Sequence, residues 1–363
     1  MNAPNETFEA TMTRFIRATP EQVYAAFVQP ELLARWQCPR GLTAEVSVDP
    51  RVGGRYRIAM RARDGSTHVA IGEYLALEPG RRVSYSWTWE GGGPIPEGMN
   101  TLVEVELAAR DGGTALTMRH SGFHLAAVRD GHAQGWTSVL NRLNDLLDPQ
   151  GTAGTLVLLG DPRSTYTRTA RMAFAEKGVA VTLKPVAPHS PELLAVNPMG
   201  RIPALLDGPT ALWETSAIVR WVDECFGDGP LLVPQAGITA RMHCERWVSM
   251  VNAYFYDTMV RRYVLQYVFP KGEGGQPDRA VIDKAVPEMA RQLGLLEEAY
   301  AAGDFLAGGA LSMADLVVAP ILAYVAQLPE GQRLLTDMPN VRRAQAAMAQ
   351  RPSFVATAPG ASQ

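Results

Sequence analysis

The segment DPQGTAG, residues 148–154, decides how this chain is divided. It is small and polar and carries one proline and two glycines, a composition typical of a linker. Before it, apolar residues recur mostly with a period of two, whereas after it short apolar strands alternate with helices. We therefore predict a domain at 7–148, a linker at 149–154 and a separate C-terminal region from 155 onward.

Length, composition and charge narrow the class of protein. The chain has 363 residues, which suggests two or three folding units at about 100–200 residues each. Hydrophobic residues make up 47% and the formal net charge is −3, so no overall field attracts nucleic acid or an anionic membrane. The longest apolar stretch, 316–325, is broken by Pro320 and is shorter than the about 20 residues of a membrane span. We expect neither nucleic acid nor membrane as a partner.

The cysteines and the N-terminal residues indicate the cellular compartment of the protein and whether cysteines could bind a metal. Cys38, Cys225 and Cys244 are far apart and form no CxxC pair, so neither a structural zinc site nor a disulfide framework is indicated. The first residues, MNAPNETFEA, lack the basic and apolar pattern of a secretory signal. We expect a cytoplasmic protein with no metal at its site.

The N-terminal segment follows the order helix, many strands, long helix. Thr19 and Gln22 form a capping-box pattern at a helix start, with Pro20 at the first helical position. Residues 43–123 alternate like strands, and the helix that ends the segment carries one apolar stripe from Trp136 to Leu147. These patterns predict an antiparallel sheet with the long helix on one face, and an apolar cavity if helix and sheet splay apart.

The C-terminal region begins as strand, helix, strand and continues as helices alone. A strand is expected at 155–160, a helix at 170–177 that Gly178 ends, and a second strand at 179–186. Beyond Pro234 the pattern is helical throughout. We predict a thioredoxin-like α/β domain at 155–232 and an all-α domain at 235–358.

The loop after the first strand of this region, GDPRSTYTR at 160–168, lies where an α/β sheet places its ligands. It offers the hydroxyls of Ser164, Thr165, Tyr166 and Thr167 instead of a cysteine. A hydroxyl at a helix N-terminus, together with the helix dipole, stabilises a thiolate and lowers the pKa of a bound thiol. The alternative is that Ser164 only caps the helix.

Two further motifs point to the same cleft. In NPMGRIPALLDG, 197–208, a cis bond between Ile202 and Pro203 would present backbone groups to a peptide ligand, although Pro203 is also compatible with an ordinary edge strand. In LWETSAI, 212–218, Glu214 and Thr215 open a helix, where the N–H groups bind a carboxylate and Glu214 pairs with an ammonium group. Simple helix capping is the alternative for both residues.

Two other patterns are interpreted as structural. Ser312 and Asp315 predict a reciprocal helix cap, with Leu311 and Leu316 as a hydrophobic staple, at the start of a buried helix. A stripe on the helix after Thr239 is expected to be mostly core, with one or two members facing the cleft as an apolar acceptor pocket. Its members are Trp247, Met250, Tyr254 and Met259.

Residues 155–357 resemble a glutathione S-transferase of the serine type. The resemblance is carried by AEKG, SPELLAVNPMGRIPAL, ETSAIVRWVD, SMADLVVAP and MPNVRRAQAAMAQRPSF. It implies that Ser164 activates the glutathione thiol, with Thr165 or Thr167 as the alternative donors. It also implies that Ile202, beside Pro203, pairs its backbone with the cysteinyl unit. It also implies that the γ-glutamyl end is held by Glu214 and Thr215, and that His189 and Arg201 lie near the glycyl carboxylate.

Residues 7–147 resemble the START-like group that includes activators of a heat-shock chaperone ATPase. The resemblance rests on RFIRATPEQVYAAFVQPELLARWQCPRG, GGRYRI, GEYLALEPGRRVSYSW and GWTSVLNRL. It implies a helix-grip α+β fold with a cavity for apolar ligands. Functions in this group are diverse, so the fold alone assigns none.

Together the two resemblances imply a cytoplasmic, homodimeric glutathione transferase that conjugates glutathione to a hydrophobic electrophile. Glutathione is a co-substrate and no cofactor is expected. The N-terminal domain would bind the hydrophobic substrate or product, in detoxification or a stress response. The alternative is a non-catalytic stress or co-chaperone protein that uses a transferase-like fold for interaction.

Overall fold

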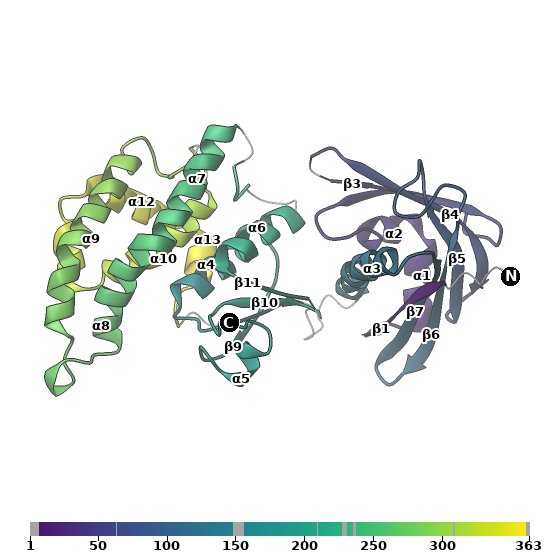
Figure 1. Ribbon diagram of the computed structural model, residues 1–363, viewed down its shortest axis with the longest axis horizontal. Coiled ribbons are helices and arrows are strands. Elements are labelled where there is room, and N and C mark those ends of the chain that lie inside the picture. Colours follow the sequence, from purple (N-terminus) through teal and green to yellow (C-terminus); the bar gives the residue numbers. More distant parts are fainter. Residues whose placement is uncertain are drawn as a thin grey trace. The chain divides into compact units, whose positions relative to one another are not determined.

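The structure is a computed structural model that describes residues 7–62, 64–147, 156–208, 210–226, 231–234, 237–307 and 309–360. It divides into two compact units (Figure 1). The N-terminal unit comprises residues 1–156 with 207–210, and the C-terminal unit comprises 157–206 with 211–363. The predicted linker at 149–154 lies outside the described residues.

The N-terminal unit is an antiparallel sheet that curves around three helices (Figure 1). Helix α3 packs against strand β1 and helix α2, as the predicted helix-grip arrangement requires. The strand order is β1-β7-β6-β5-β4-β3-β2. The strands are β1 (Phe8–Ile16), β2 (Thr43–Val48), β3 (Arg55–Arg61), β4 (Thr67–Glu78), β5 (Arg82–Trp89), β6 (Thr101–Arg110) and β7 (Gly113–Phe123), and the helices are α1 (Pro20–Val28), α2 (Pro30–Trp36) and α3 (Ala126–Leu147).

Local sequence rules account for the start of α1 and the buried face of α3. The Thr19 amide donates to Gln22 Oε1 at 2.9 Å, and the Gln22 amide donates back to Thr19 Oγ1 at 3.3 Å. This confirms the predicted capping box. On α3, Trp136, Leu140 and Leu143 are buried against the sheet, as the apolar stripe predicts.

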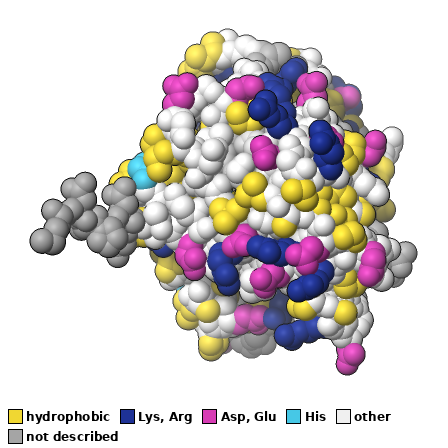
Figure 2. All heavy atoms as spheres, turned by 90° about the vertical axis from the view of Figure 1, so that its right-hand side faces the viewer, with side chains coloured by type: hydrophobic (Ala, Val, Ile, Leu, Met, Phe, Trp, Pro, Cys, Tyr) yellow, Lys and Arg dark blue, Asp and Glu magenta, His cyan; other side chains and the backbone are white. Residues whose placement is uncertain are grey.

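The sheet surface carries paired charges. Arg57 pairs with Glu90 at 2.8 Å, and Arg82 pairs with Glu104 at 2.6 Å. Figure 2 shows basic and acidic side chains interspersed on the face that it draws. Exposed pairs of this kind contribute little to stability, because solvent screens the two charges. Because the two signs alternate there, this face presents no broad positive field to a polyanion.

The interior of this unit is filled where the sequence predicts a cavity. The rings of Trp87 and Trp136 are in contact, with centroids 5.1 Å apart, so helix and sheet do not splay. A small cavity beside Tyr56 and Tyr85 measures about 10 Å³, which is room for about one water molecule. Large aromatic side chains therefore occupy the described space between helix α3 and the sheet.

A buried histidine is held in one protonation state by its neighbours. Trp136 Nε1 donates to His120 Nδ1 at 2.8 Å, so the ring proton resides on Nε2, which lies 2.7 Å from Thr101 Oγ1. Thr101 donates in turn to the Trp87 carbonyl at 2.9 Å. His120 is fully buried, and this burial holds its pKa well below the usual range.

Acid is expected to destabilise the N-terminal unit through His120. Below pH about 6.5 the unfolded chain binds a proton that the folded unit excludes, so the unfolding free energy falls by about 1.4 kcal/mol per pH unit. Hydrogen exchange of β6 and β7 between pH about 7 and 5 measures this slope. His120→Gln should flatten it, and an unchanged slope in the variant would contradict the assignment.

The C-terminal unit begins with a thioredoxin-like α/β part. Its sheet has the order β11-β10-β8-β9, with β8 and β9 parallel, and helices α4 and α6 pack against each other. This is the predicted architecture. The strands are β8 (Leu156–Gly160), β9 (Thr182–Pro185), β10 (Ala204–Asp207) and β11 (Thr210–Trp213), and the helices are α4 (Thr165–Glu176), α5 (Pro191–Leu194) and α6 (Thr215–Cys225).

Helices make up the rest of this unit and surround the buried helix α10. Among the described helices, none is by itself long and apolar enough to cross a bilayer, although the bent pair α10 and α11 passes that test together. The segments are α7 (Ile238–Met250), the π-helix η1 (Val251–Val264), α8 (Leu265–Val268), η2 (Glu273–Gly275), α9 (Arg279–Tyr300), α10 (Met313–Val325), α11 (Pro329–Leu335), α12 (Pro339–Ala349) and α13 (Pro352–Ala356).

The predicted cap of α10 is present. The amide and hydroxyl of Ser312 both donate to Asp315 Oδ2 at 2.8 Å, and the Leu306 amide donates to Asp315 Oδ1 at 2.9 Å. Burial raises the pKa of Asp315 to about 6, although all three hydrogen bonds favour the carboxylate. Leu311 and Leu316, the predicted staple, are both buried.

A buried ion pair joins α4 to α6. Lys177 Nζ lies 2.7 Å from Asp223 Oδ1, and the two side chains are 0% and 1% exposed. The carboxylate of Asp223 also accepts the backbone amides of Leu232 at 2.9 Å and Val233 at 3.0 Å. Asp223 therefore connects three separate segments of the C-terminal unit through one side chain.

Candidate functional site

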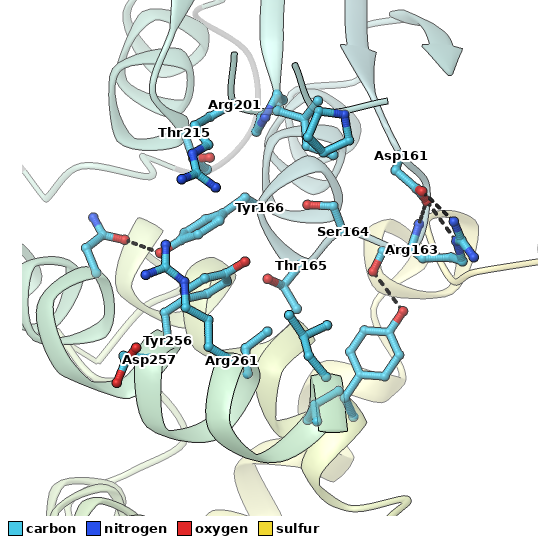
Figure 3. Close-up of a pocket in the computed structure, with 18 of the residues that line it drawn as sticks. Asp161, Arg163, Ser164, Thr165, Tyr166, Arg201, Thr215, Tyr256, Asp257 and Arg261 are labelled. Atoms are coloured by element: carbon cyan, nitrogen blue, oxygen red, sulfur yellow. Dashed lines mark hydrogen bonds and ion pairs between the residues drawn. The ribbon is translucent and has the colours of Figure 1, made fainter. Parts of the chain in front are cut away.

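A cavity of about 1040 Å³ lies within the C-terminal unit, between its α/β part and its helices. The residues that line it come from four places in the sequence (Figure 3). They belong to the loop 161–166, to 187–203, to the first turn of α6 and to the length of η1 and α8, with Tyr324 and Pro359 at the edge.

Ser164 is the N-cap of α4 and lines the cavity. Its oxygen accepts the Thr167 amide at 3.3 Å, which uses a lone pair and leaves the hydroxyl hydrogen to donate. Figure 3 shows the hydroxyl pointing toward the middle of the cavity. The two sequence interpretations are thus compatible, because the same side chain can cap the helix and donate to a ligand at its positive end.

The other loop hydroxyls differ in their access to the cavity. Thr165 lines it beside Ser164, whereas Thr167 is fully buried and is not among the described lining residues. A Cβ added to Gly160 would lie 2.5 Å from Thr167 Oγ1, so this hydroxyl faces the end of strand β8. The structure therefore narrows the predicted alternatives for a thiolate donor to Ser164 and Thr165.

The loop before α4 is held in place by its own contacts. Arg163 pairs with Asp161 at 2.7 Å. Tyr324 on α10 donates its hydroxyl to the Arg163 carbonyl at 2.8 Å. Both contacts lie directly before Ser164, so they fix the position of the helix N-terminus relative to the helical part of the unit.

Arg201, Ile202 and Pro203 form a second wall, and all three line the cavity as predicted. The Ile202–Pro203 bond is cis, in agreement with the sequence prediction. Asn197 Nδ2 donates to the Arg201 carbonyl at 2.7 Å and so fixes the turn that precedes this wall.

The third wall is the N-terminus of α6, where Glu214 and Thr215 line the cavity. Glu214 has a φ of 70°, a conformation that costs about 1–3 kcal/mol in a non-glycine residue and often marks a functional site. It makes no side-chain capping hydrogen bond, so the first amides of α6 have no side-chain cap. This argues against simple capping and leaves the helix end able to bind an anion.

His189 lies beside the wall that carries Arg201 and is held by Gly200. It is exposed and is not among the described residues that line the cavity. Its amide donates to the Gly200 carbonyl at 2.9 Å, and a Cβ on Gly200 would lie 2.4 Å from His189 Nδ1. The imidazole therefore lies over Gly200, the residue before Arg201, and the backbone at His189 has a φ of 60°.

Sequence analysis missed the aromatic floor of the cavity. The rings of Tyr166 and Tyr256 are stacked, with centroids 4.6 Å apart, and the Tyr166 hydroxyl donates to Asn252 Oδ1 at 3.0 Å. Burial raises the pKa of both phenols, so both remain protonated and able to donate at neutral pH. The signal available was Tyr166 itself, which lies in the loop singled out for its hydroxyls.

The residues that η1 contributes were also missed. The predicted candidates Trp247, Met250, Tyr254 and Met259 are absent from the described lining. Lining positions recur instead every four residues, at 252, 256, 260, 264 and 268 and at the positions that follow each of these. These positions follow the π-helix η1 and the helix α8, whereas Trp247 and Met250 lie on the preceding helix α7.

Within the described ranges, no group of three or more His, Cys, Asp or Glu side chains is placed to hold a metal ion. The cavity's polar groups are hydroxyls, guanidinium groups, carboxylates and helix ends. This arrangement suits a small molecule that carries both charges and a thiol.

Comparison with known proteins agrees with this division of the chain. Residues 17–148 match the family described as activator of Hsp90 ATPase homolog 1-like protein. Residues 163–225 and 255–352 match the N-terminal and C-terminal domains of glutathione S-transferases. Glutathione S-transferase 3 of Zea mays is 31% identical over 208 residues, which are 56% of this chain and 92% of that relative. Glutathione S-transferase F10 of Arabidopsis thaliana is 30% identical over 50% of this chain and 86% of that relative.

Solved structures show the same likeness. Glutathione transferase F7 from Populus trichocarpa has a TM-score of 0.52 and 27% identity, over 56% of this chain and 97% of its own. Glutathione S-transferase III, solved in its apo form, has a TM-score of 0.50 and 32% identity, over 56% of this chain and 94% of its own. These likenesses cover about half of the chain, a length that corresponds to the C-terminal unit.

Proposed function

Because this chain belongs to the glutathione S-transferase family, we propose that it transfers glutathione to a hydrophobic electrophile. The observation that carries the proposal is that Ser164, Arg201, Glu214 and the uncapped first turn of α6 all line one cavity. This set includes a thiolate donor and a partner for each charged group of glutathione.

The charges of glutathione match these groups one by one. Glu214 would pair with the γ-glutamyl ammonium, while the Thr215 hydroxyl and the first amides of α6 would bind its carboxylate. The Ile202 backbone would pair with the cysteinyl unit. Arg201 would hold the glycyl carboxylate at the far end of the same wall.

The chemistry is stabilisation of a thiolate followed by substitution. Ser164 donates its hydroxyl hydrogen to the sulfur, and the end of α4 adds a partial positive charge, so the thiol loses its proton to solvent near neutral pH. The sulfur lone pair then forms an S–C bond with the electrophile, and the leaving group departs with the electrons of the bond that breaks. Holding the thiolate and the electrophile close together in one cavity further accelerates the reaction.

Arg201→Gln is expected to raise KM for glutathione about tenfold with little change in kcat, because it removes a charge-assisted bond to a group remote from the sulfur. Steady-state kinetics with a chlorodinitrobenzene as acceptor measures this. His189→Gln tests the other residue that the resemblance places near this carboxylate, and it should raise KM for glutathione as well. If only the histidine variant raises KM, the glycyl carboxylate lies at His189 and the placement of Arg201 is wrong.

The non-catalytic alternative rests on the N-terminal match to chaperone ATPase activators. A cavity that retains Ser164, Glu214 and Thr215 argues against an inactive transferase fold. Calorimetry with glutathione and turnover of an aryl halide separate the two functions, because the alternative requires neither. The filled core around Trp87 and Trp136 gives no support to an apolar ligand in the N-terminal unit, so we propose none there.

The family resemblance carries three further proposals: a homodimer, a cytoplasmic location and a role in detoxification or the stress response. Light scattering of the purified protein tests the first directly. A mass twice that of one chain is expected, and a mass equal to one chain would contradict it.

A further inference from the structure

One cation of the cavity remains after the charges of glutathione are assigned. Asp161 is neutralised by Arg163 at 2.7 Å, and Asp257 is neutralised by Arg262 at 2.9 Å. Arg201 and Glu214 are assigned to glutathione. Arg261 on η1 lines the cavity as well, and within the described part of the chain no carboxylate is paired with it.

The guanidinium of Arg261 is positioned by an aromatic ring. It lies 5.4 Å from the ring centroid of Tyr256, which stacks on Tyr166. Figure 3 shows the side chain rising beside Tyr256 on the floor of the cavity. This cation–π contact does not use up the N–H groups of the guanidinium, which can therefore bind an anion.

Apolar side chains surround this cation. Val260, Val264 and Leu265 line the cavity on the same helical surface as Arg261. Val268 and Phe269 continue the wall and are 46% and 55% exposed. One unpaired cation within an apolar wall fits a ligand that has a hydrophobic body and one anionic group.

We infer that Arg261 selects electrophiles that carry a carboxylate, with the apolar body of the acceptor against Val260, Val264 and Leu265. This inference rests on the proposed glutathione transfer and assigns its acceptor class. A bound thiolate repels an anionic acceptor in the same cavity, and Arg261 offsets that repulsion. A neutral acceptor needs no such partner.

The test compares a chloronitrobenzoate with the chloronitrobenzamide that has the same ring positions, using glutathione as the other substrate. Arg261→Gln should lower kcat/KM for the benzoate about tenfold or more and for the benzamide by less than about twofold, with KM for glutathione unchanged. The quantity to compare is the ratio of kcat/KM for the benzoate to kcat/KM for the benzamide, measured in the wild type and in the variant. Because both enzymes use the same two acceptors, the difference in intrinsic reactivity between the acceptors cancels. Arg261→Lys should keep part of the preference, since it keeps the charge.

Arg333→Gln is the matched control, because this arginine lies in the same unit and is not among the described residues lining the cavity. It should leave the ratio of kcat/KM for the benzoate to kcat/KM for the benzamide unchanged. If Arg261→Gln lowers both acceptors equally, the arginine acts on the thiolate or on the fold. If it raises KM for glutathione, the arginine belongs to the glutathione site. Either result overturns the inference.

Binding of the preformed conjugates tests the same point without turnover. By calorimetry, the wild type should bind the carboxyphenyl conjugate of glutathione more tightly than the carbamoylphenyl conjugate, and Arg261→Gln should bind both alike. If the wild type binds glutathione and converts the benzamide without favouring the carboxylate, only the inference fails. If glutathione neither binds nor reacts, the proposed function fails and the inference with it.

Discussion

Replacement of Ser164 by alanine is expected to lower kcat for glutathione transfer by about a hundredfold. The variant loses the hydroxyl at the N-terminus of α4 that faces the cavity. The hydrogen bond from this hydroxyl stabilises the thiolate of glutathione more than it stabilises the neutral thiol. Turnover of glutathione with a chlorodinitrobenzene, measured at saturating acceptor, gives the effect directly.

Two variants act as controls for this result. Thr165→Val removes the neighbouring hydroxyl of the cavity and Thr167→Val removes the buried one, and both should retain most of the activity. Ser164→Thr should restore activity, because it returns both the cap and the hydroxyl. If Ser164→Ala remains fully active while Thr165→Val does not, the donor is Thr165.

Replacement of Asp223 by alanine is expected to lower the unfolding free energy of the C-terminal unit by about 3–5 kcal/mol. The change leaves the Lys177 ammonium buried without its partner and removes the acceptor of the Leu232 and Val233 amides. Hydrogen exchange of peptides from α4 and α6 measures the loss, and peptides from the N-terminal unit serve as an internal reference.

An exposed ion pair provides the matched comparison. Lys184 pairs with Glu192, and their side chains are 56% and 47% exposed. Glu192→Ala should therefore cost at most about 1 kcal/mol. A cost for Asp223→Ala that is as small as this would show that burial of the Lys177 pair does not control the stability of the unit.

Features set by neighbouring residues could be predicted from sequence. The caps at Thr19 and Ser312 follow from side chains three positions away, and the structure contains both. The α+β, thioredoxin-like and all-α parts follow from hydrophobic periodicity and from the motifs of the transferase family. Of the candidate site, Ser164, Arg201 and Glu214 come together in one cavity as expected.

Features that depend on tertiary packing could not be predicted. The core of the N-terminal unit is closed by contact between Trp87 and Trp136, which lie on different elements. The φ of 60° at His189 is a backbone conformation that the sequence does not indicate in a non-glycine residue. The acceptor wall follows η1 and α8, and the sequence does not indicate that residues 251–264 form a π-helix.

The pKa of the glutathione thiol when bound tests the central claim most directly. Ultraviolet difference absorption follows the thiolate as pH is varied, with the wild type and Ser164→Ala compared at saturating glutathione. The account predicts a thiol pKa of about 7 or lower in the wild-type complex and a return toward about 8.5 in the variant. A pKa equal to that of free glutathione in the wild-type complex, or no binding of glutathione, would contradict it.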